Sequence, residues 1–350
     1  MSHSLIASLC AAMIDHAASD LFVRQGEIPK VRQHGEILTW GESAISLEDL
    51  SAFRTLCNVP LESRDADASY THANGARFRV SFFRQLGLSS AIVRRVATTV
   101  PPLETLGLPH ELLKEWMSRK SGLILITGPT NTGKSTTIAA GLEWVNQNFT
   151  KHILSIEDPI EFLFVGHHCI FTQREVGVDT DSFARGLKQA LRQSPDIIMV
   201  GEIRDRETAQ IALQAAETGH LVIATLHSGT CTESLERLVR LFPSDEREGI
   251  SMILSSQLIG IQCQRLLPAL DGGMVAAVEH LHNQGLSRRY ILENRWKELI
   301  DFLHKSDSPK NCSILNWLIQ LCRKNLISEE AALSIVQNPQ DLQRALKGIA

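Results

Sequence analysis

The sequence predicts an α/β protein in which a small N-terminal α+β unit precedes a doubly wound sheet and a C-terminal helical region. Three observations support this class. Continuous apolar runs alternate with helix-periodic segments in the middle of the chain, a pattern typical of parallel strands buried on both faces. A glycine-rich loop joins the first of these runs to a helix-compatible segment. The last part of the chain consists of short segments that begin with capping residues.

Residues 1–100 are predicted to form the α+β unit. Strand signals occur at 19–24, 30–32 and 77–83, the last being the run RFRVSFF. Two consecutive prolines then disfavour regular structure, and residues 101–110 are predicted to be a linker.

Residues 111–285 are predicted to form the sheet unit, and residues 286–350 a helical region. The apolar runs of the sheet unit are continuous, as expected of buried strands, with a helix at 207–216 before the last of them. The four predicted strands are 122–127, 153–156, 197–200 and 221–224. Of the C-terminal helices, the last two begin at the caps Ser328 and Asn338.

Length and composition are those of a globular chain with two or three domains. The 350 residues are 43% apolar and 21% charged, which is sufficient for a buried core. Lys and Arg number 35 against 39 Asp and Glu, which gives a net charge of −4 without a long block of either sign. We therefore expect no nucleic-acid partner.

Signals for secretion, membrane insertion and disulfides are missing from the sequence. His3, Asp15 and His16 interrupt the N-terminal apolar stretch, and no later run reaches the ~18 apolar residues of a membrane-spanning helix. The seven cysteines are scattered and include no C-x-x-C pair. We therefore expect a cytoplasmic protein with reduced cysteines and without a structural zinc site.

The run GPTNTGKST matches the phosphate-loop pattern G-x-x-x-x-G-K-[ST]. Glycines let backbone N–H groups converge on phosphate oxygens, and the amino end of the following helix adds positive potential. Lys134 supplies a mobile cation, and Ser135 supplies a hydroxyl ligand for Mg²⁺. The predicted nucleotide-binding residues are Gly128, Pro129, Thr130, Asn131, Thr132, Gly133, Lys134, Ser135 and Thr136.

Hydrolysis needs a carboxylate that orients water, and three polar side chains follow predicted strands where such a group is expected. Glu202 follows the third strand in the run PDIIMVGEIRD, Glu157 follows the second, and His227 follows the fourth. Because the carboxyl ends of parallel strands meet at one sheet edge, these residues are predicted to form one site with the phosphate loop. Gly201 stands where many phosphate-loop enzymes have a metal-holding Asp.

Four blocks in this order resemble the secretion-ATPase superfamily, and most closely the type IV pilus twitching-motility (retraction) ATPases. GPTNTGKST resembles the Walker A motif of that family, ILSIEDPIEF its Asp box, LRQSPDIIMVGEIRD its Walker B motif and ETGHLVIATLH its His box. The resemblance covers nearly the whole chain. It implies a PAS-like unit over 1–100 and a RecA-like unit over 111–285, and a homo-hexamer driven by ATP and Mg²⁺.

The resemblance also implies residue roles. Lys134 and Ser135 would hold phosphate and Mg²⁺, Glu202 would activate water, Glu157 would support water or metal, and His227 would sense the γ-phosphate.

Family members also place arginines of a neighbouring subunit against the nucleotide, and Arg79 and Arg94 match those positions best. Both lie in the segment 70–102, which contains five arginines and no Asp, Glu or Lys. A cationic stretch without acids of its own suits a surface directed at phosphate.

The implied function is retraction of type IV pili. The implied partners are an inner-membrane pilus platform protein and a paralogous pilus ATPase, with the motor peripheral to the inner membrane at the pilus base. The run RWKELI at 295–300 replaces the A-I-R-N-L-I motif of the family, which is tied to retraction rather than to nucleotide chemistry. Two alternatives therefore stay open: a motor for a conjugation or type IV secretion platform, and a weakly active paralogue that regulates a sister pilus ATPase.

Overall fold

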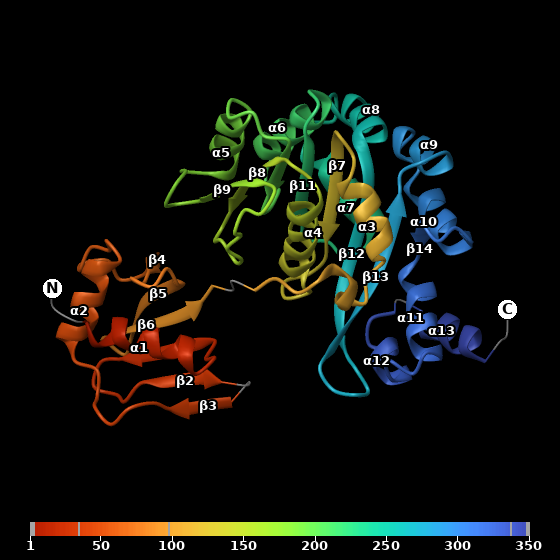
Figure 1. Cartoon of the computed structure of the whole chain (residues 1–350). Helices are drawn as coiled ribbons and strands as arrows, with labels where there is room; N and C mark the ends of the chain where they lie inside the picture. The colour runs from red at the N-terminus through yellow and green to blue at the C-terminus, as the bar shows by residue number, and fades with distance from the viewer. Residues whose placement is uncertain (1–3, 34–35, 97–98, 337, 348–350) are drawn as a thin grey trace. The chain divides into compact units, whose positions relative to one another are not determined.

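The computed structural model describes residues 4–33, 36–96, 99–336 and 338–347 of the 350-residue chain. These residues form two compact units, most of whose helices and strands are labelled in Figure 1. The first unit comprises the chain up to Thr98 together with Pro159–Leu163, and the second comprises Thr99–Asp158 and Phe164–Ala350.

The first unit contains one antiparallel six-stranded sheet in the order β3-β2-β1-β6-β5-β4. Its strands are β1 Asp20–Arg24, β2 Lys30–Gln33, β3 Glu36–Thr39, β4 Ala66–Thr71, β5 Arg77–Gln85 and β6 Leu88–Arg95. The three strands predicted for this unit are confirmed as β1, β2 and β5. The α+β prediction for the unit is also confirmed, because α1 (Leu5–Asp15) and α2 (Leu47–Leu56) accompany the sheet.

One face of the first sheet is packed and the other is open. Along β5, Phe78, Val80 and Phe82 are buried, whereas Arg79 between them is exposed. Successive residues of a strand point to opposite faces, so this alternation separates an apolar face from a polar one. The apolar face shares a core with buried side chains of α1 and α2.

The second unit contains an eight-stranded sheet in the order β14-β13-β12-β7-β11-β10-β8-β9. From β12 to β9 neighbouring strands are parallel, and β13 and β14 are added antiparallel. The strands are β7 Gly122–Thr127, β8 His152–Glu157, β9 Ile170–Glu175, β10 Ile197–Val200, β11 Leu221–Leu226, β12 Leu258–Pro268, β13 Met274–His282 and β14 Asn311–Cys312. The four predicted strands are confirmed as β7, β8, β10 and β11.

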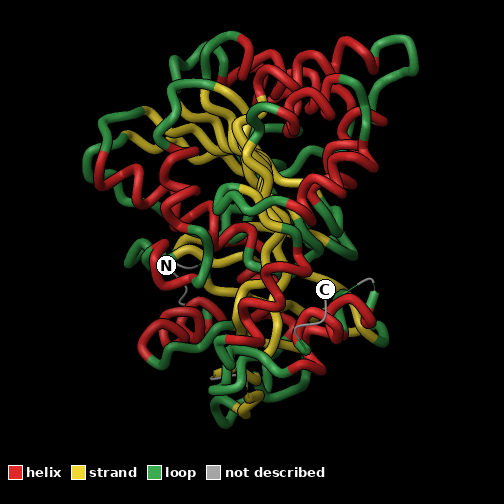
Figure 2. The backbone as a smooth tube through the Cα atoms, turned by 90° about the vertical axis from the view of Figure 1, so that its right-hand side faces the viewer, coloured by secondary structure: helices red, strands yellow, loops and turns green. Residues whose placement is uncertain are grey.

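Helices cover both faces of the second sheet, and Figure 2 shows its strands as a band with helices on either side. On β7, Leu123 and Leu125 join the core on one face, and Ile124 and Ile126 join the core on the other. The first core involves α5 Phe183–Ala190, α6 Arg206–Glu217, α7 Cys231–Arg240, α8 Arg247–Gln257, α9 Leu286–Leu292 and α10 Trp296–Lys305. The second involves η1 Leu103–Leu106, α3 His110–Met117 and α4 Lys134–Asn148.

The β12–β13 hairpin was not predicted from the sequence. Its first strand carries Gln262 and Gln264, which interrupt the apolar run LIGIQCQRLLP, although both are fully buried. A strand buried on both faces normally shows a continuous apolar run. One of these two residues, Gln264, donates a hydrogen bond to the glycine-rich loop, and Gln262 donates to Gln264.

The C-terminal region contains α9, α10, α11 (Ile314–Arg323), α12 (Glu329–Leu333) and α13 (Pro339–Leu346), and it supplies β14 to the sheet. The predicted caps Ser328 and Asn338 are confirmed, because each side-chain oxygen accepts a backbone N–H of the first turn. Ser313 caps α11 in the same way.

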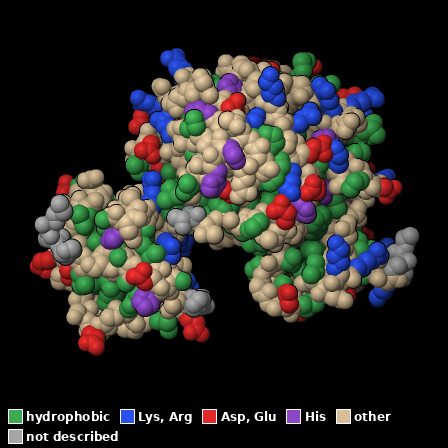
Figure 3. All heavy atoms as spheres, in the orientation of Figure 1, with side chains coloured by type: hydrophobic (Ala, Val, Ile, Leu, Met, Phe, Trp, Pro, Cys, Tyr) green, Lys and Arg blue, Asp and Glu red, His purple; other side chains and the backbone are tan. Residues whose placement is uncertain are grey.

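Charged side chains of both signs are scattered over the face of the second unit shown in Figure 3, as the balanced composition suggests. All seven cysteines are free thiols, and six of them are buried. None of the helices in the described ranges combines the length and apolar character that crossing a bilayer requires.

Candidate functional site

The phosphate loop links the carboxyl end of β7 to the amino end of α4. Gly128 has φ +141° and Gly133 has φ +82°, values that residues with a side chain rarely adopt. A Cβ on Gly128 would also lie 2.3 Å from the carbonyl oxygen of Gln264. Glycine is therefore required at this position for two independent reasons.

Lys134, the first residue of α4, is buried and folds back over the loop. Its Nζ donates to the carbonyl oxygens of Gly128 (2.9 Å) and Pro129 (2.7 Å). The hydroxyl of Thr132 donates to the same Pro129 oxygen at 2.9 Å. The ammonium thus lies among the loop residues, as a phosphate-binding lysine requires.

Gln264 of β12 holds the loop from the side. Its Nε2 donates to the carbonyl oxygen of Thr132 at 2.6 Å, and its Oε1 accepts from the hydroxyl of Thr137 on α4 at 3.1 Å. One buried amide therefore ties the loop and the following helix to the neighbouring strand. Sequence reasoning missed Gln264, because only pairing between β12 and β7 brings it to the loop.

The predicted Glu202 and His227 lie together at the carboxyl edge of the sheet. Nε2 of His227 is 3.1 Å from Oε1 of Glu202, and Nε of Arg204 donates to Oε2 at 2.6 Å. These residues share an open pocket with Pro129 and Thr130 of the phosphate loop. Arg204 was not predicted, although its place two residues after Glu202 in the quoted run was a usable signal.

Glu157 lies apart from this pocket. It ends β8 rather than following it, and it is buried. The hydroxyl of Ser155 donates to its Oε1 at 2.6 Å, and Nε2 of Gln173 donates to the same oxygen at 3.3 Å. The carboxylate is therefore held rigidly at the strand end.

Backbone packing explains the glycine before Glu202. A Cβ on Gly201 would lie 3.1 Å from the carbonyl oxygen of Ile156 and 3.3 Å from Cα of Glu157. Strands β8 and β10 are thus closely apposed at this edge.

Arg79 and Arg94 lie on the open face of the first sheet, directly opposite each other on β5 and β6. Both are exposed. Like charges in this register repel each other, so the pair does not stabilise the sheet.

The inference that this cationic stretch lacks a counter-ion is wrong for Arg94. Its Nε donates to Oδ1 of Asp20 at 2.7 Å, and Arg32 lies 3.5 Å from Oδ2 of the same carboxylate. The acid comes from β1, outside the acid-free segment, and strand pairing brings it into line.

Comparisons with known proteins agree with this architecture. The family model described as type II/IV secretion system protein matches residues 66–314. The chain is 39% identical to the type IV pilus ATPase PilU of Pseudomonas aeruginosa over 348 residues, which cover 97% of this chain and 90% of that protein. It is 35% identical to the type IV pilus retraction ATPase PilT of the same organism over 342 residues, or 96% and 99% of the two chains.

Two solved structures resemble the whole chain. The crystal structure of the pilus retraction motor PilT with bound ADP superimposes with a TM-score of 0.88 at 37% identity, and the match covers 97% of this chain and 99% of that one. The ATPase DotB of Legionella pneumophila gives 0.82 at 29% identity, with 94% and 95% covered. The phosphate loop, the residues at the sheet edge and these matches together show that the chain belongs to the type II/IV secretion system protein family of ATPases.

Proposed function

We propose that this chain is a motor that hydrolyses ATP to drive retraction of type IV pili, the movement that underlies twitching motility. The observation that carries the proposal is the pair Glu202–His227 in one pocket with the phosphate loop. A phosphate loop alone supports nucleotide binding, whereas a carboxylate at the same edge supports hydrolysis. The names of the relatives, a pilus ATPase and a retraction ATPase, support the assignment to pili.

ATP would bind with its phosphates in the loop 128–136. The positive φ of its glycines and the ammonium of Lys134 among the loop carbonyls fit a phosphate group. Bound Mg²⁺ would neutralise charge on the phosphates, and Ser135 is the residue that would hold it. In the described part of the chain no three His, Cys, Asp or Glu residues form a metal site of their own. Phosphate oxygens and water would therefore complete the coordination.

Glu202 would orient the attacking water and accept its proton. In the structure Oε2 accepts a hydrogen bond from Arg204 and Oε1 lies 3.1 Å from Nε2 of His227, and each oxygen can also accept a hydrogen bond from water. The side chain is 12% exposed, so water can reach it. His227 would contact the γ-phosphate while it donates to Glu202, and Glu157, at the end of the neighbouring strand, would support the water or the metal.

The motor would be a homo-hexamer in which Arg79 and Arg94 of one subunit approach the nucleotide of the next. Guanidinium groups stabilise charge on a phosphoryl group during transfer, and arginines supplied in trans are an established means to do so. We place the hexamer in the cytoplasm at the inner-membrane pilus base, where it would act on a pilus platform protein and alongside a paralogous pilus ATPase.

Two observations favour functions other than pilus retraction. The match to the family model described as type II/IV secretion system protein fits a motor that acts on a type IV secretion platform. Two pilus ATPases of one organism, PilU and PilT, both match the chain, and together with the run RWKELI this fits a weakly active paralogue that regulates a sister motor. In that run Leu299 and Ile300 match the retraction motif, whereas Arg295 and Lys297, which depart from it, are exposed, so the departure alters the surface.

ATP turnover by the purified full chain tests the catalytic assignment. We expect Lys134→Ala and Glu202→Ala each to lower turnover by about a thousandfold, since both remove groups that act on the transferred phosphoryl group or the water. Glu202→Ala should still bind ATP, whereas Lys134→Ala should not. Substantial hydrolysis by the Glu202 variant would contradict its role, and an inactive wild-type chain would favour the regulatory paralogue.

A deletion strain tests the assignment to retraction. Cells that keep long surface filaments but lose twitching would support it. Bald, non-motile cells would favour pilus assembly instead, and unchanged filaments and motility would favour a secretion platform.

A further inference from the structure

Glu279 is a buried acidic residue for which the proposed hydrolysis has no use. It lies on β13 and is 7% exposed. Burial raises the pKa of its carboxyl, because the charged form loses its hydration. A buried carboxylate is tolerated only where hydrogen bonds replace the lost water.

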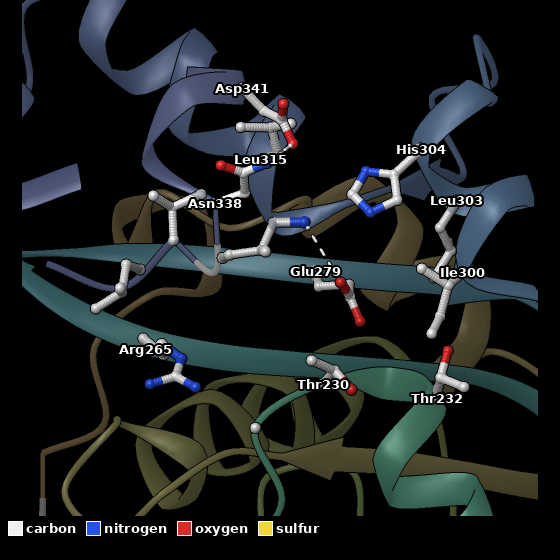
Figure 4. Close-up of a pocket in the computed structure, with 14 residues that line it drawn as sticks. Thr230, Thr232, Arg265, Glu279, Ile300, Leu303, His304, Leu315, Asn338 and Asp341 are labelled. Carbon is white, nitrogen blue, oxygen red and sulfur yellow. Dashed lines mark hydrogen bonds between the residues drawn. The ribbon is translucent and has the colours of Figure 1, made fainter. Parts of the chain in front are cut away.

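Its two carboxylate oxygens accept hydrogen bonds from the first backbone N–H groups of two different helices. Oε1 accepts the backbone N–H of Cys231, the first residue of α7, at 2.7 Å. Oε2 accepts the backbone N–H of Ile314, the first residue of α11, at 3.4 Å, which Figure 4 marks with a dashed line. The first amides of a helix have no partner within the helix, and they carry its positive end. One carboxylate thus joins the amino ends of both helices.

Helix α7 is in contact with both parts of the proposed active site. The segment that precedes it contains His227, whose carbonyl oxygen accepts a hydrogen bond from Arg237 of α7. The hydroxyl of Ser234, also on α7, donates at 3.0 Å to the hydroxyl of Thr127, the last residue before the phosphate loop. Helix α7 is therefore hydrogen-bonded to the backbone at His227 and to the side chain of Thr127 at the end of β7.

Helix α11 belongs to the C-terminal region, and the packing beside Glu279 is incomplete. A pocket of about 180 Å³ separates parts of this region from β12 and β13. Figure 4 shows Glu279 at its wall, with His304 and Leu303 of α10 on one side and Asn338 and Asp341 on another. Away from this pocket, α11 packs on β12 and β13 through Leu318 and Leu321, and β14 pairs with β13. The hydrogen bonds to Glu279 are the connection that also reaches the amino end of α7.

We propose that Glu279 is a positioning residue that keeps His227 against Glu202 by holding the amino end of α7 to that of α11. Through it, the C-terminal helical region controls the geometry of the hydrolytic site without touching nucleotide. The inference rests on the proposed roles of Glu202 and His227.

Replacement of Ile314 by proline removes one of the two hydrogen bonds selectively. Proline lacks the N–H group and is well tolerated at the first position of a helix. The preceding residue, Ser313, has φ −72° and ψ 156°, which is the conformation favoured before proline. Ile314→Ala keeps the N–H and removes the same side chain, and it is the matched control.

We expect Ile314→Pro to lower kcat for ATP by about fivefold relative to Ile314→Ala, with an unchanged KM, since the phosphate loop is not altered. A merely structural role predicts equal kcat values for the two variants, or a fall in Tm without a selective change in kcat. Either result would overturn the inference. A wild-type chain without turnover would instead refute the proposed function, so the two failures are distinguishable.

Glu279→Gln provides a second test that does not depend on proline. An amide has one acceptor oxygen, so the substituted side chain can serve only one of the two N–H groups and turns its own NH₂ toward the other. We expect Glu279→Gln to lower kcat when it is introduced into the wild-type chain. In a chain that already carries Ile314→Pro it should cause no further loss, because only the N–H of Cys231 then needs an acceptor. Additive losses would show that the two groups act independently and would overturn the inference.

Discussion

The two sheets of this protein place their polar side chains differently. The sheet of the first unit has one packed face and one open face, and its charged residues form a row across the open face. The sheet of the second unit is packed on both faces, so its reactive groups lie at the strand ends and along β12. Substitutions should therefore affect the two units differently. In the second unit, a substitution that lowers activity is expected to disturb the packing as well. On the open face of the first unit, a substitution can lower activity without lowering stability.

The largest effect is expected at Gly128. Gly128→Ala places a methyl group 2.3 Å from the Gln264 carbonyl at a φ of +141°, so the loop must move. We expect ATP affinity, measured by calorimetry, to fall by about a thousandfold, because loop amides that converge on phosphate are displaced. Gly249→Ala on α8 is the control, because its Cβ would meet no atom within 4 Å. It should leave ATP affinity unchanged, and equal losses in the two variants would contradict the steric argument.

A second large effect in the packed unit concerns pH. Burial lowers the pKa of His280 to about 4, so between pH 4 and 6.5 the unfolded chain holds more protons than the folded one. Stability should therefore rise with pH across this window, by up to about 3 kcal/mol, and be lost as the pH falls through it. We expect the free energy of unfolding of His280→Gln, measured by urea denaturation, to change less with pH than that of the wild-type protein. The same change at the exposed His16 is the control, and equal slopes in both variants would contradict the prediction.

A smaller effect on activity is expected on the open face. Arg79→Ala should reduce ATP turnover of the assembled protein by about tenfold and leave Tm within a degree or two of wild type, since an exposed side chain facing a like charge adds little to stability. Arg84→Ala, at the far end of β5 and on the opposite face of the strand from Arg79, is the control and should retain full turnover. Equal activity of the two variants would remove Arg79 from the proposed site.

The smallest effect is expected at the capping box of α2. The Ser46 hydroxyl accepts the N–H of Asp49, and the Asp49 carboxylate accepts the N–H of Ser46. Ser46→Ala should destabilise the first unit by about 1 kcal/mol, whereas Ser51→Ala in the same helix should not. Chemical denaturation of both variants measures the difference. Equal midpoints would show that the cap adds nothing to stability.

Half of the described strands in each unit were predicted from the sequence, three of six in the first and four of eight in the second. Strands buried on both faces leave continuous apolar runs, so β7, β8, β10 and β11 were found, and the residues after their ends followed from the rule that such ends share an edge. β3, β4 and β6 were not found, because half-exposed strands have mixed composition. Contacts made by strand pairing, such as Gln264 on the phosphate loop or Asp20 on Arg94, join residues distant in sequence and leave no local signal.

The buried cysteines have a practical consequence for spectroscopy. Burial raises the pKa of Cys57 to about 12 and that of Cys312 to about 11, and it also raises that of Cys322, which alone among the seven is only partly buried. We therefore expect a maleimide fluorophore to react first at Cys322 in the native protein, without removal of the other thiols. The dye would sit on α11, the helix whose amino end Glu279 holds, and its emission would report motion of that helix during turnover.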